Sequence, residues 1–387
     1  MLRYLTSGES HGKALIAILE GIPAGLRLSN KDIDKDLARR QVGYGRGGRM
    51  HIEKDKVEIL SGVRLGKTLG SPLTLMIKNL DWENWQEIMN VNEIKGKEIK
   101  ALTHPRPGHA DFAGLIKYNF KDIRDVLERA SARETAVRVA IGAVCRKFLQ
   151  EFGIYLYSRV IQIGKVKDES EWQPLNENYS LIENSSLRCL SKEAEKGMIA
   201  LIDEAKKSGD SLGGIFEVMI TGLPIGLGSY IQWDLKLDAC LARAIMSIQA
   251  IVGIEIGLGF SAAKKFGSQV QDEIFYDKQK KKFYRLTNNA GGIEGGMTNG
   301  EPIILRAAMK PISTLAQPLH SVDFITKKEV KAIKERADVC AVPAAAVIGE
   351  GVSAFEIAKT MREKFSGDSL EEAKRNYESY LKRIINR

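Results

Sequence analysis

The chain has 387 residues, of which 44% are hydrophobic and 28% charged, a balance typical of a packed globular protein rather than a disordered one. No apolar run approaches the ~20 residues of a membrane helix, and the N-terminus lacks the apolar segment of a secretory signal, so we expect a soluble, cytoplasmic protein without a membrane partner. The net charge of +9 favours anionic partners. The four cysteines are Cys145, Cys189, Cys240 and Cys340. Because they form no CxxC pair and no zinc-ligand spacing, they predict a reducing compartment and no metal site.

Short apolar runs and helical periodicities alternate along the chain, and no low-complexity linker divides it. In chain order the pattern predicts a strand at 14–20, helices at 29–40, 133–150 and 193–207, a strand at 215–220 and a long buried helix at 237–252. An outer helix is expected to start at the capping box formed by Ser369 and Glu372. We therefore expect one fused domain that spans residues 1–387.

One turn sequence occurs twice. GIPAGL at 21–26 is echoed by GLPIGL at 222–227, and each copy follows an apolar, strand-like run. One interpretation is an internal duplication with halves near 1–200 and 201–387, related by a pseudo-twofold that places a site between them. The alternative is a chance likeness among residues that are common in turns.

Arginines cluster beside glycine and serine. Four of them fall within eleven residues around a glycine-rich loop: Arg39, Arg40, Arg46 and Arg49. Arg129 and Arg133 are four residues apart, so we expect them on one helical face, where a bound polyanion would relieve their repulsion. Guanidinium groups bind carboxylate and phosphate through paired hydrogen bonds, which favours a small, multiply charged ligand. The alternative is ordinary salt bridges, for example to Glu128 or Glu134.

Two histidines lie in glycine-containing loops beside charged residues, His11 within 8–12 and His109 within 106–111. A lone histidine is usually structural, but two in such company favour a functional role. Neither belongs to a metal-ligand pattern, and no GxSxG motif accompanies them. The segment 310–314 offers a lysine and two hydroxyls to a phosphate or a polar ring edge. The glycine-rich segment 291–296 suits close approach to a flat ligand, or else forms a mobile surface loop.

Two other classes of function stay open from the residues alone. The GxGxxG pattern at 257–262 follows a strand-like run and would suit a nicotinamide-dependent oxidoreductase, although such glycines also serve close packing. The similar pattern at 43–48 follows a helix end and lacks the context of a dinucleotide site. A nucleic-acid-binding protein is the second alternative. It would need aromatic residues between the basic ones, and Tyr44 alone serves.

Seven motifs, in the family's order, make the chain resemble the chorismate synthases along nearly its whole length. They are GESHG at 8–12, RRQxGYGR at 39–46, RPGHAD at 106–111, ERASARET at 128–135, GGIEGG at 291–296, KPIST at 310–314 and RAD at 336–338. One departure is Ala337, where many members have histidine.

The resemblance implies a lyase that converts 5-enolpyruvylshikimate 3-phosphate to chorismate and phosphate, the last step of the shikimate pathway to aromatic amino acids. It implies a 1,4-anti elimination that requires reduced FMN (FMNH2), supplied by an external reductase, without net redox change. It further implies an α+β fold, a β-α-β sandwich of two antiparallel sheets around helices, and a homotetramer that binds neither nucleic acid nor a membrane.

The resemblance also implies roles for individual residues. His109 would be the acid toward the departing phosphate, His11 would set the protonation of the flavin, and Asp338 with Ser10 would relay a proton. The implied FMN contacts are Arg129, Ala130, Ser131, Gln249, Ala250, Gly295, Lys310, Pro311, Ile312, Ser313, Thr314 and Arg336. The implied substrate contacts are Arg39, Arg40, Arg46, Arg49, Arg106 and Arg133, of which Arg40 and Arg46 match positions linked in some members to NADPH.

Overall fold

The computed structural model describes residues 1–47, 53–94, 96, 99–171, 176–279, 281–333 and 338–385. Helices and antiparallel sheets are both abundant in these ranges, so the expectation of a mixed α+β protein is confirmed. Within the same ranges, no helix has the length and apolar character that crossing a membrane would require.

The first sheet has four antiparallel strands in the order β1 (Arg3–Ser7), β2 (Ala14–Glu20), β6 (Leu73–Lys78) and β3 (Val57–Ser61). The strand expected at 14–20 is confirmed. Leu15, Ala17 and Leu19 are buried while the residues between them are less so. This alternation gives the sheet one apolar face for helices to cover.

The second sheet has five strands, also antiparallel, in the order β10 (Ile251–Ile256), β15 (Ile303–Met309), β9 (Gly214–Thr221), β7 (Tyr155–Ile163) and β8 (Val166–Lys167). The strand expected at 215–220 is confirmed as β9. β10 is an antiparallel edge strand followed by the short helix η4 (Gly259–Lys264), so the glycines at 257–262 lack the parallel βαβ unit of a dinucleotide site.

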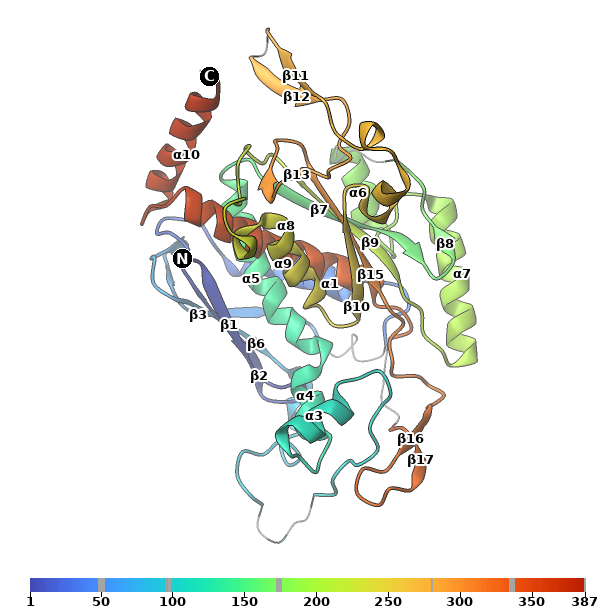
Figure 1. Cartoon of the computed structure of the whole chain (residues 1–387). Coiled ribbons are helices and arrows are strands. Elements are labelled where there is room, and N and C mark those ends of the chain that lie inside the picture. The colour runs from blue at the N-terminus through green and yellow to red at the C-terminus, as the bar shows by residue number, and fades with distance from the viewer. Residues whose placement is uncertain are drawn as a thin grey trace.

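Helices lie between and beside the sheets (Figure 1). α5 (Thr135–Gln150) packs on β2 and β6, α9 (Val342–Lys364) packs on β7 and β9, and the two helices pack on each other and on α1 (Asn30–Gln41). A Cβ on Gly142 would stand 2.3 Å from the Cα of Gly351, so α5 and α9 meet through two glycines. α8 (Leu237–Met246) covers β10 and contacts α9.

Smaller elements decorate this core. The hairpin of β11 (Ile274–Asp277) and β12 (Lys282–Arg285) and the helix α10 (Leu370–Ile385) extend from one end of the molecule, while α3 (Asp111–Tyr118), α4 (Arg124–Ala130) and the hairpin of β16 (His320–Val322) and β17 (Glu329–Lys331) lie at the other (Figure 1). The remaining elements are β4 (Val63–Arg64), β5 (Lys67–Thr68), η1 (Leu80–Asn84), η2 (Ala132–Glu134), α6 (Asn176–Asn184), α7 (Lys192–Ser208), η3 (Trp233–Leu235), η5 (Gly267–Gln269), β13 (Ile293–Glu294) and β14 (Met297–Thr298).

Most predicted helices are confirmed to within a few residues as α1, α5, α7 and α10, and Ser369 Oγ accepts from the backbone N of Glu372 at 3.2 Å, as the capping box requires. The long helix expected at 237–252 is wrong. α8 ends at Met246, Ala250 takes a left-handed φ of +65°, and β10 begins at Ile251. A mostly apolar stretch suits a buried strand as well as a helix, and pairing with β15 makes its end, from Ile251 on, a strand.

Candidate functional site

The loop after β1 holds His11 against helix α4. One carboxylate oxygen of Glu128 lies 2.8 Å from His11 Nδ1, and the other accepts from the His11 backbone N at 2.7 Å. The backbone N of Ser10 donates to the Glu128 carbonyl at 2.9 Å, and Ser10 is itself buried. The indole of Trp85 stacks on the imidazole with 3.8 Å between ring centroids. Three hydrogen bonds therefore join two of the sequence motifs, and the stacked indole of Trp85 adds a fourth contact that holds the ring.

Arg129 ends α4 and reaches the same loop from the other side. It donates to the carbonyls of Gly8 at 3.0 Å and Thr6 at 3.1 Å, and to Thr6 Oγ1 at 2.8 Å. All these acceptors are neutral, and in the part of the chain that the structure describes no carboxylate pairs with this exposed guanidinium. Its charge is open to an anionic ligand.

Arg133 does not share a helical face with Arg129, which corrects the expectation. Ser131 has extended backbone (ψ 141°), ends α4 and caps the short helix η2. Arg133 consequently points inward, where it donates to Asp55 at 2.5 Å and to Asn79 Oδ1 at 3.0 Å. Asn79 in turn donates to the carbonyl of Gly12 at 2.6 Å. Arg133 thus supports the His11 loop from beneath with its charge already balanced.

Arg40 lies beside Arg133 in the interior. It donates to Thr135 Oγ1 at 3.0 Å and to the Ala132 carbonyl at 3.1 Å, and its guanidinium is 3.4 Å from Asp55. Burial lowers the pKa of Arg40 to about 10, with Asp55 opposing that shift and Arg133 adding to it. The side chain remains charged at neutral pH and locks the start of α5 to α1.

Arg46 and Asp338 form the next pair in the same region, 3.1 Å apart. Asp338 also accepts from the backbone N of Gly47 at 2.6 Å, so the glycine-rich loop and the segment before α9 are joined. Two further predicted ligands, Arg49 and Arg336, lie outside the described residues, as does Ala337.

Arg39 does not belong to this region, and its assignment to the substrate is corrected. All three of its nitrogens donate within the protein, to Glu183 at 2.7 and 2.9 Å, Glu350 at 2.8 and 2.9 Å, Asp36 at 2.9 Å and Tyr179 at 2.6 Å. It lies on a different face of α1 from Arg40, in a buried ion cluster between α1, α6 and α9. Such a saturated guanidinium has no donor left for a ligand.

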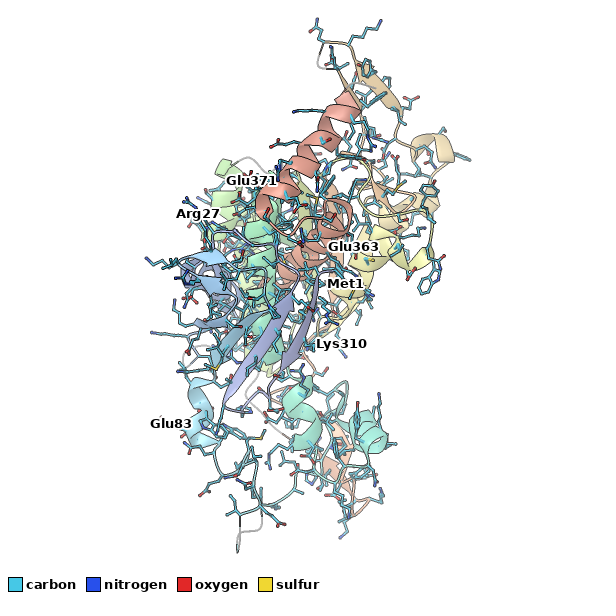
Figure 2. The ribbon with its side chains drawn as sticks, turned by 90° about the vertical axis from the view of Figure 1, so that its left-hand side faces the viewer. Met1, Arg27, Glu83, Lys310, Glu363 and Glu371 are labelled. Carbon is cyan, nitrogen blue, oxygen red and sulfur yellow. The ribbon has the colours of Figure 1, made fainter. Side chains whose placement is uncertain are left out.

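The His109 loop is built around a second closed pair. Arg106 binds Asp111 through Nε at 2.8 Å and Nη2 at 2.9 Å, which neutralises the arginine and shapes the turn. His109 Nε2 lies 2.9 Å from Thr314 Oγ1, while Lys310 Nζ donates to the Gly108 carbonyl at 2.9 Å. The segment 310–314 therefore sits directly against this loop, and Lys310 is visible where the α3–α4 end joins the body (Figure 2).

The pKa of His109 is lowered from its ordinary value. Burial is the largest cause, followed by the positive charge of Arg106, with Lys310 adding to it and Asp111 opposing. The imidazole is thus held neutral at a pH where an exposed histidine would begin to protonate. An anion placed beside it would reverse that effect.

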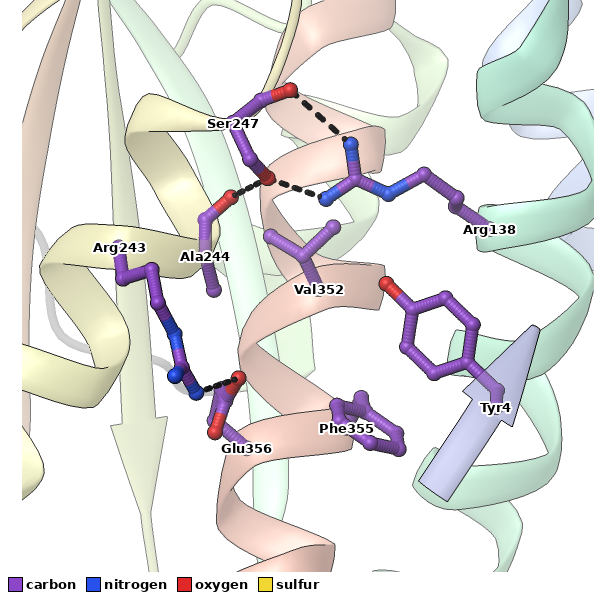
Figure 3. A pocket seen from close by; sticks show the side chains of 8 residues that line it. All are labelled: Tyr4, Arg138, Arg243, Ala244, Ser247, Val352, Phe355 and Glu356. Atoms are coloured by element: carbon purple, nitrogen blue, oxygen red, sulfur yellow. Dashed lines mark hydrogen bonds and ion pairs between the residues drawn. The ribbon is translucent and has the colours of Figure 1, made fainter. Parts of the chain in front are cut away.

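The turn after α8 lies against the same segment. The backbone N of Lys310 donates to the Ala250 carbonyl at 2.9 Å, and Arg138 donates to Ser247 Oγ at 2.6 Å and to its carbonyl at 3.2 Å (Figure 3). Gln249 Oε1 is buried and has no hydrogen-bond partner among the described residues, so it is available to a ligand donor. The cavity of about 280 Å³ beside Arg138 contains none of the predicted site residues.

Pro311 and Ile312 continue the segment that lies against the turn after α8. The Ile312 carbonyl accepts from Ser211 Oγ at 2.6 Å, and a Cβ on Gly213 would lie 2.2 Å from the Met309 carbonyl. These contacts fix the backbone of the segment between Lys310 and Thr314.

Gly295 is not brought to the other predicted cofactor residues within one chain. It lies in the turn between β13 and β14, before β15 begins at Ile303, whereas Lys310 follows the end of β15 at Met309. Seven residues of strand separate the two ends, a span of roughly 20 Å.

The remaining predicted residues form two groups, one with His11 and one with His109. They are connected where the backbone N of Leu212 donates to the Val339 carbonyl at 2.8 Å and Ser211 Oγ donates to the Ile312 carbonyl at 2.6 Å, and we call the two groups together the site belt. Its members are Ser10, His11, Arg129, Ala130, Ser131, Arg133, Arg40, Arg46, Asp338, the segment 310–314, Gln249, Ala250, Arg106 and His109. Only Arg129 and Lys310 among its described cations lack a carboxylate partner. Open cations, an orphaned amide oxygen and hydroxyls at the belt's edge fit a ligand that carries phosphate and polar ring atoms, as FMN does.

Comparisons with known proteins identify the family of the chain. A profile of the family described as chorismate synthase matches residues 2–361. Proteins named chorismate synthase are 59% identical in Syntrophotalea carbinolica, covering 98% of this chain and 97% of the relative, and 57% identical in Geobacter sulfurreducens, covering 99% of both. A crystal structure of chorismate synthase matches with a TM-score of 0.81 and 46% identity, over 100% of this chain and 99% of that one.

These matches define an enzyme, of the lyase class. Because the profile and the relatives cover nearly the whole chain, the chain belongs to the chorismate synthase family.

Sequence reasoning missed the partners that hold the site residues in place. Glu128 stands next to Arg129 in a quoted motif, and its position there was the one available signal. Asn79, Asp55 and Trp85 come from segments with no motif. The fold brings Asn79 and Trp85 to the loop at 8–12 and Asp55 to Arg133.

Proposed function

We propose that the chain converts 5-enolpyruvylshikimate 3-phosphate to chorismate and phosphate by 1,4-anti elimination, as the last step of the shikimate pathway, in the cytoplasm. The observation that carries the proposal is the site belt. Most of its cations are neutralised by carboxylates, and the two open ones, Arg129 and Lys310, flank the two histidine loops. A substrate with one phosphate and two carboxylates needs such open cations around proton-transfer groups.

We infer that reduced FMN is held by Arg129, Ala130 and Ser131, by Gln249 and Ala250, and by the segment 310–314, with Arg336 expected to join them. When bound, reduced FMN supplies transient electron donation to an elimination without net redox change. The task of the chain itself is to bind the anions, exclude water and hold protons at defined atoms.

His109 is proposed as the acid toward the departing phosphate. Its Nε2 faces Thr314 Oγ1, so a substrate phosphate bound beside this segment would lie within reach of the imidazole. Two added negative charges raise the pKa that Arg106 and burial depress, and the proton is then held until the leaving group accepts it.

His11, with Ser10 and Asp338, is proposed to set protonation near the flavin. Asp338 is paired with Arg46, so the carboxylate and the guanidinium are proposed to act as one ion pair rather than as separate groups. Arg40 is 4% exposed and fully engaged, and we assign it to support rather than to NADPH. Reduced flavin is expected from an external reductase.

We further propose a homotetramer. Gly295 stands about one strand length from Lys310 in the same chain. If Gly295 contacts the cofactor, the contact is made to the cofactor bound by another copy of the chain. Each site is then completed by a neighbouring copy across an interface.

The two halves of the chain, we infer, are an internal duplication with a pseudo-twofold in a β-α-β sandwich. The order β1-β2-β6-β3 is repeated as β7-β9-β15-β10, which supports this inference. Thr68 Oγ1 donates to the Pro23 carbonyl at 2.6 Å, and Thr298 Oγ1 donates to the Pro224 carbonyl at 2.6 Å, in the two echoed turns. On this correspondence the second unit begins near β7, closer to residue 150 than to 201.

The test is anaerobic phosphate release from the enolpyruvyl substrate with and without reduced FMN. His109→Ala should retain FMN binding and lose turnover by roughly 10²-fold or more, the usual size of an acid–base contribution. His320→Ala, at an exposed histidine of β16, is the matched control and should release phosphate at the wild-type rate. Unchanged turnover in His109→Ala rejects the assigned role, and release without reduced FMN rejects the cofactor.

A further inference from the structure

The imidazole of His11 is fixed on three sides. Glu128, 3% exposed, places one oxygen 2.8 Å from Nδ1 and the other 2.7 Å from the His11 backbone N. Trp85 covers one face of the ring with an interplanar angle of 20°. The ring nitrogen Nε2 has no hydrogen-bond partner in the described part of the chain, and the side chain is 16% exposed.

The location of the ring proton follows from this geometry. An ionised carboxylate only accepts hydrogen bonds, so the nitrogen that faces Glu128 must carry hydrogen in both charge states of the ring. We propose that Glu128 and Trp85 are positioning residues that fix His11 as the Nδ1–H tautomer and leave Nε2 as the single ring nitrogen that exchanges a proton with the bound ligands. The catalytic meaning of this arrangement rests on the proposed function.

The proton balance is simple. Neutral His11 takes a proton at Nε2 from a bound group and becomes a cation, whose charge the Glu128 carboxylate offsets. Return of that proton restores the starting tautomer. No proton passes to Glu128, whose role is orientation and charge compensation, as in other histidine–carboxylate pairs.

Trp85 adds a steric constraint. Its Nε1 donates to Asp81 Oδ2 at 3.1 Å, which fixes the indole at the end of η1. Stacking on this anchored indole fixes the plane of the ring, and the Glu128 contact with Nδ1 decides between the two orientations that a half-turn about the Cβ–Cγ bond would exchange. Stacking and the Glu128 bonds therefore select one orientation of the same ring.

The experiment is nitrogen NMR of the full-length protein labelled with ¹⁵N-histidine, in which the signals of His11 are identified among those of the five histidines by their loss in His11→Asn. Wild-type protein should show His11 protonated at Nδ1 and unprotonated at Nε2 when neutral. In Glu128→Gln the amide oxygen should turn to the His11 backbone N–H, which needs an acceptor, and the amide NH2 then faces Nδ1. The expected result is the inverted, Nε2–H tautomer.

Glu134→Gln is the matched control, because Glu134 accepts from Thr6 Oγ1 in the same region and, among the residues that the structure describes, forms no hydrogen bond or ion pair with His11. It should leave the His11 tautomer unchanged. Trp85→Leu should broaden the His11 signals through ring motion, and Trp85→Phe should restore sharp ones. Turnover should fall roughly 10²-fold or more in Glu128→Gln.

A wild-type spectrum with His11 protonated at Nε2 overturns the proposal without any variant. An unchanged tautomer in folded Glu128→Gln does the same. If the tautomer results hold but His11→Asn turns over like wild type, the positioning is upheld and the catalytic role of His11 fails instead.

Discussion

Two arginines on neighbouring positions of one helix, both paired with carboxylates and with little side-chain exposure, belong to different networks of charge. Arg39 belongs to the interior ion cluster, in which three cations face three carboxylates: Arg39, Arg146 and Arg188 with Asp36, Glu183 and Glu350. Arg40, one residue further, belongs to the site belt, where Arg129 and Lys310 add charges without carboxylate partners. Nearness in sequence therefore says little about ligand binding, and the local balance of charge says more.

The difference has a physical cause. A buried charge is tolerated only when it is paired and hydrogen-bonded, because its desolvation is costly. Glu350 shows the extreme case, since Arg39 and Arg146 hold its pKa below the ordinary value despite complete burial. An exposed, unpaired cation bears no such constraint and can give its hydrogen bonds to a ligand.

The largest effect is expected from Arg39→Met, which breaks the interior ion cluster. Removing one partner leaves Glu350 and Glu183 without their main counter-charge, and the free energy of unfolding should fall by about 3–5 kcal/mol. Denaturant unfolding followed by circular dichroism measures it. FMN affinity of the folded fraction should stay at the wild-type level. Intact stability combined with weakened ligand binding would return Arg39 to the site.

Arg129→Ala, in the site belt, should do the opposite. It removes an exposed cation whose acceptors are neutral, so unfolding should change little while FMN or substrate binding weakens roughly 10- to 100-fold, the value of a charge-assisted hydrogen bond. Anaerobic titration with reduced FMN measures the affinity. Arg124→Ala on the same helix, where Arg124 lies 3.5 Å from Asp122, is the control. A lost melting transition with intact affinity contradicts this distinction.

Much of the fold was predictable because local patterns agree with it. The strand at 14–20 and the cap at Ser369 follow from periodicity and capping chemistry. The stretch 237–252 failed because its apolar run is compatible with both states, and the break at Ala250 depends on pairing with β15. In the site belt, residue types were recognisable by resemblance, but Arg133 and Asp55 are 78 positions apart, so their pairing could not be anticipated.

Lys310→Met tests, through the pKa of His109, whether the positive charge of Lys310 in the site belt acts on a neighbouring group. The pKa of His109 lies below its ordinary value of 6.5, and the positive charge of Lys310 contributes to that depression. Removing the lysine should raise the His109 pKa, measured by NMR titration of its ring. Because the folded wild-type protein resists protonating His109, its stability should decline as pH falls below about 6.5, and less so in the variant. An unmoved or lowered pKa would contradict the placement of Lys310 beside this ring.

Ser247→Ala should give the smallest effect. It deletes the hydroxyl that accepts from Arg138 at 2.6 Å and donates to the Ala244 carbonyl at 2.6 Å, but it leaves the bond from Arg138 to the Ser247 carbonyl. Two hydrogen bonds of about 0.5–1.5 kcal/mol each are therefore lost. Since the turn carries Gln249 and Ala250, the loss should appear as roughly two- to tenfold weaker FMN binding. Ser208→Ala, whose hydroxyl donates to the Ala205 carbonyl at the end of α7, provides the control. Equal affinities in both variants would mean that Arg138 supports the core alone, and that the turn holds its shape through Lys310.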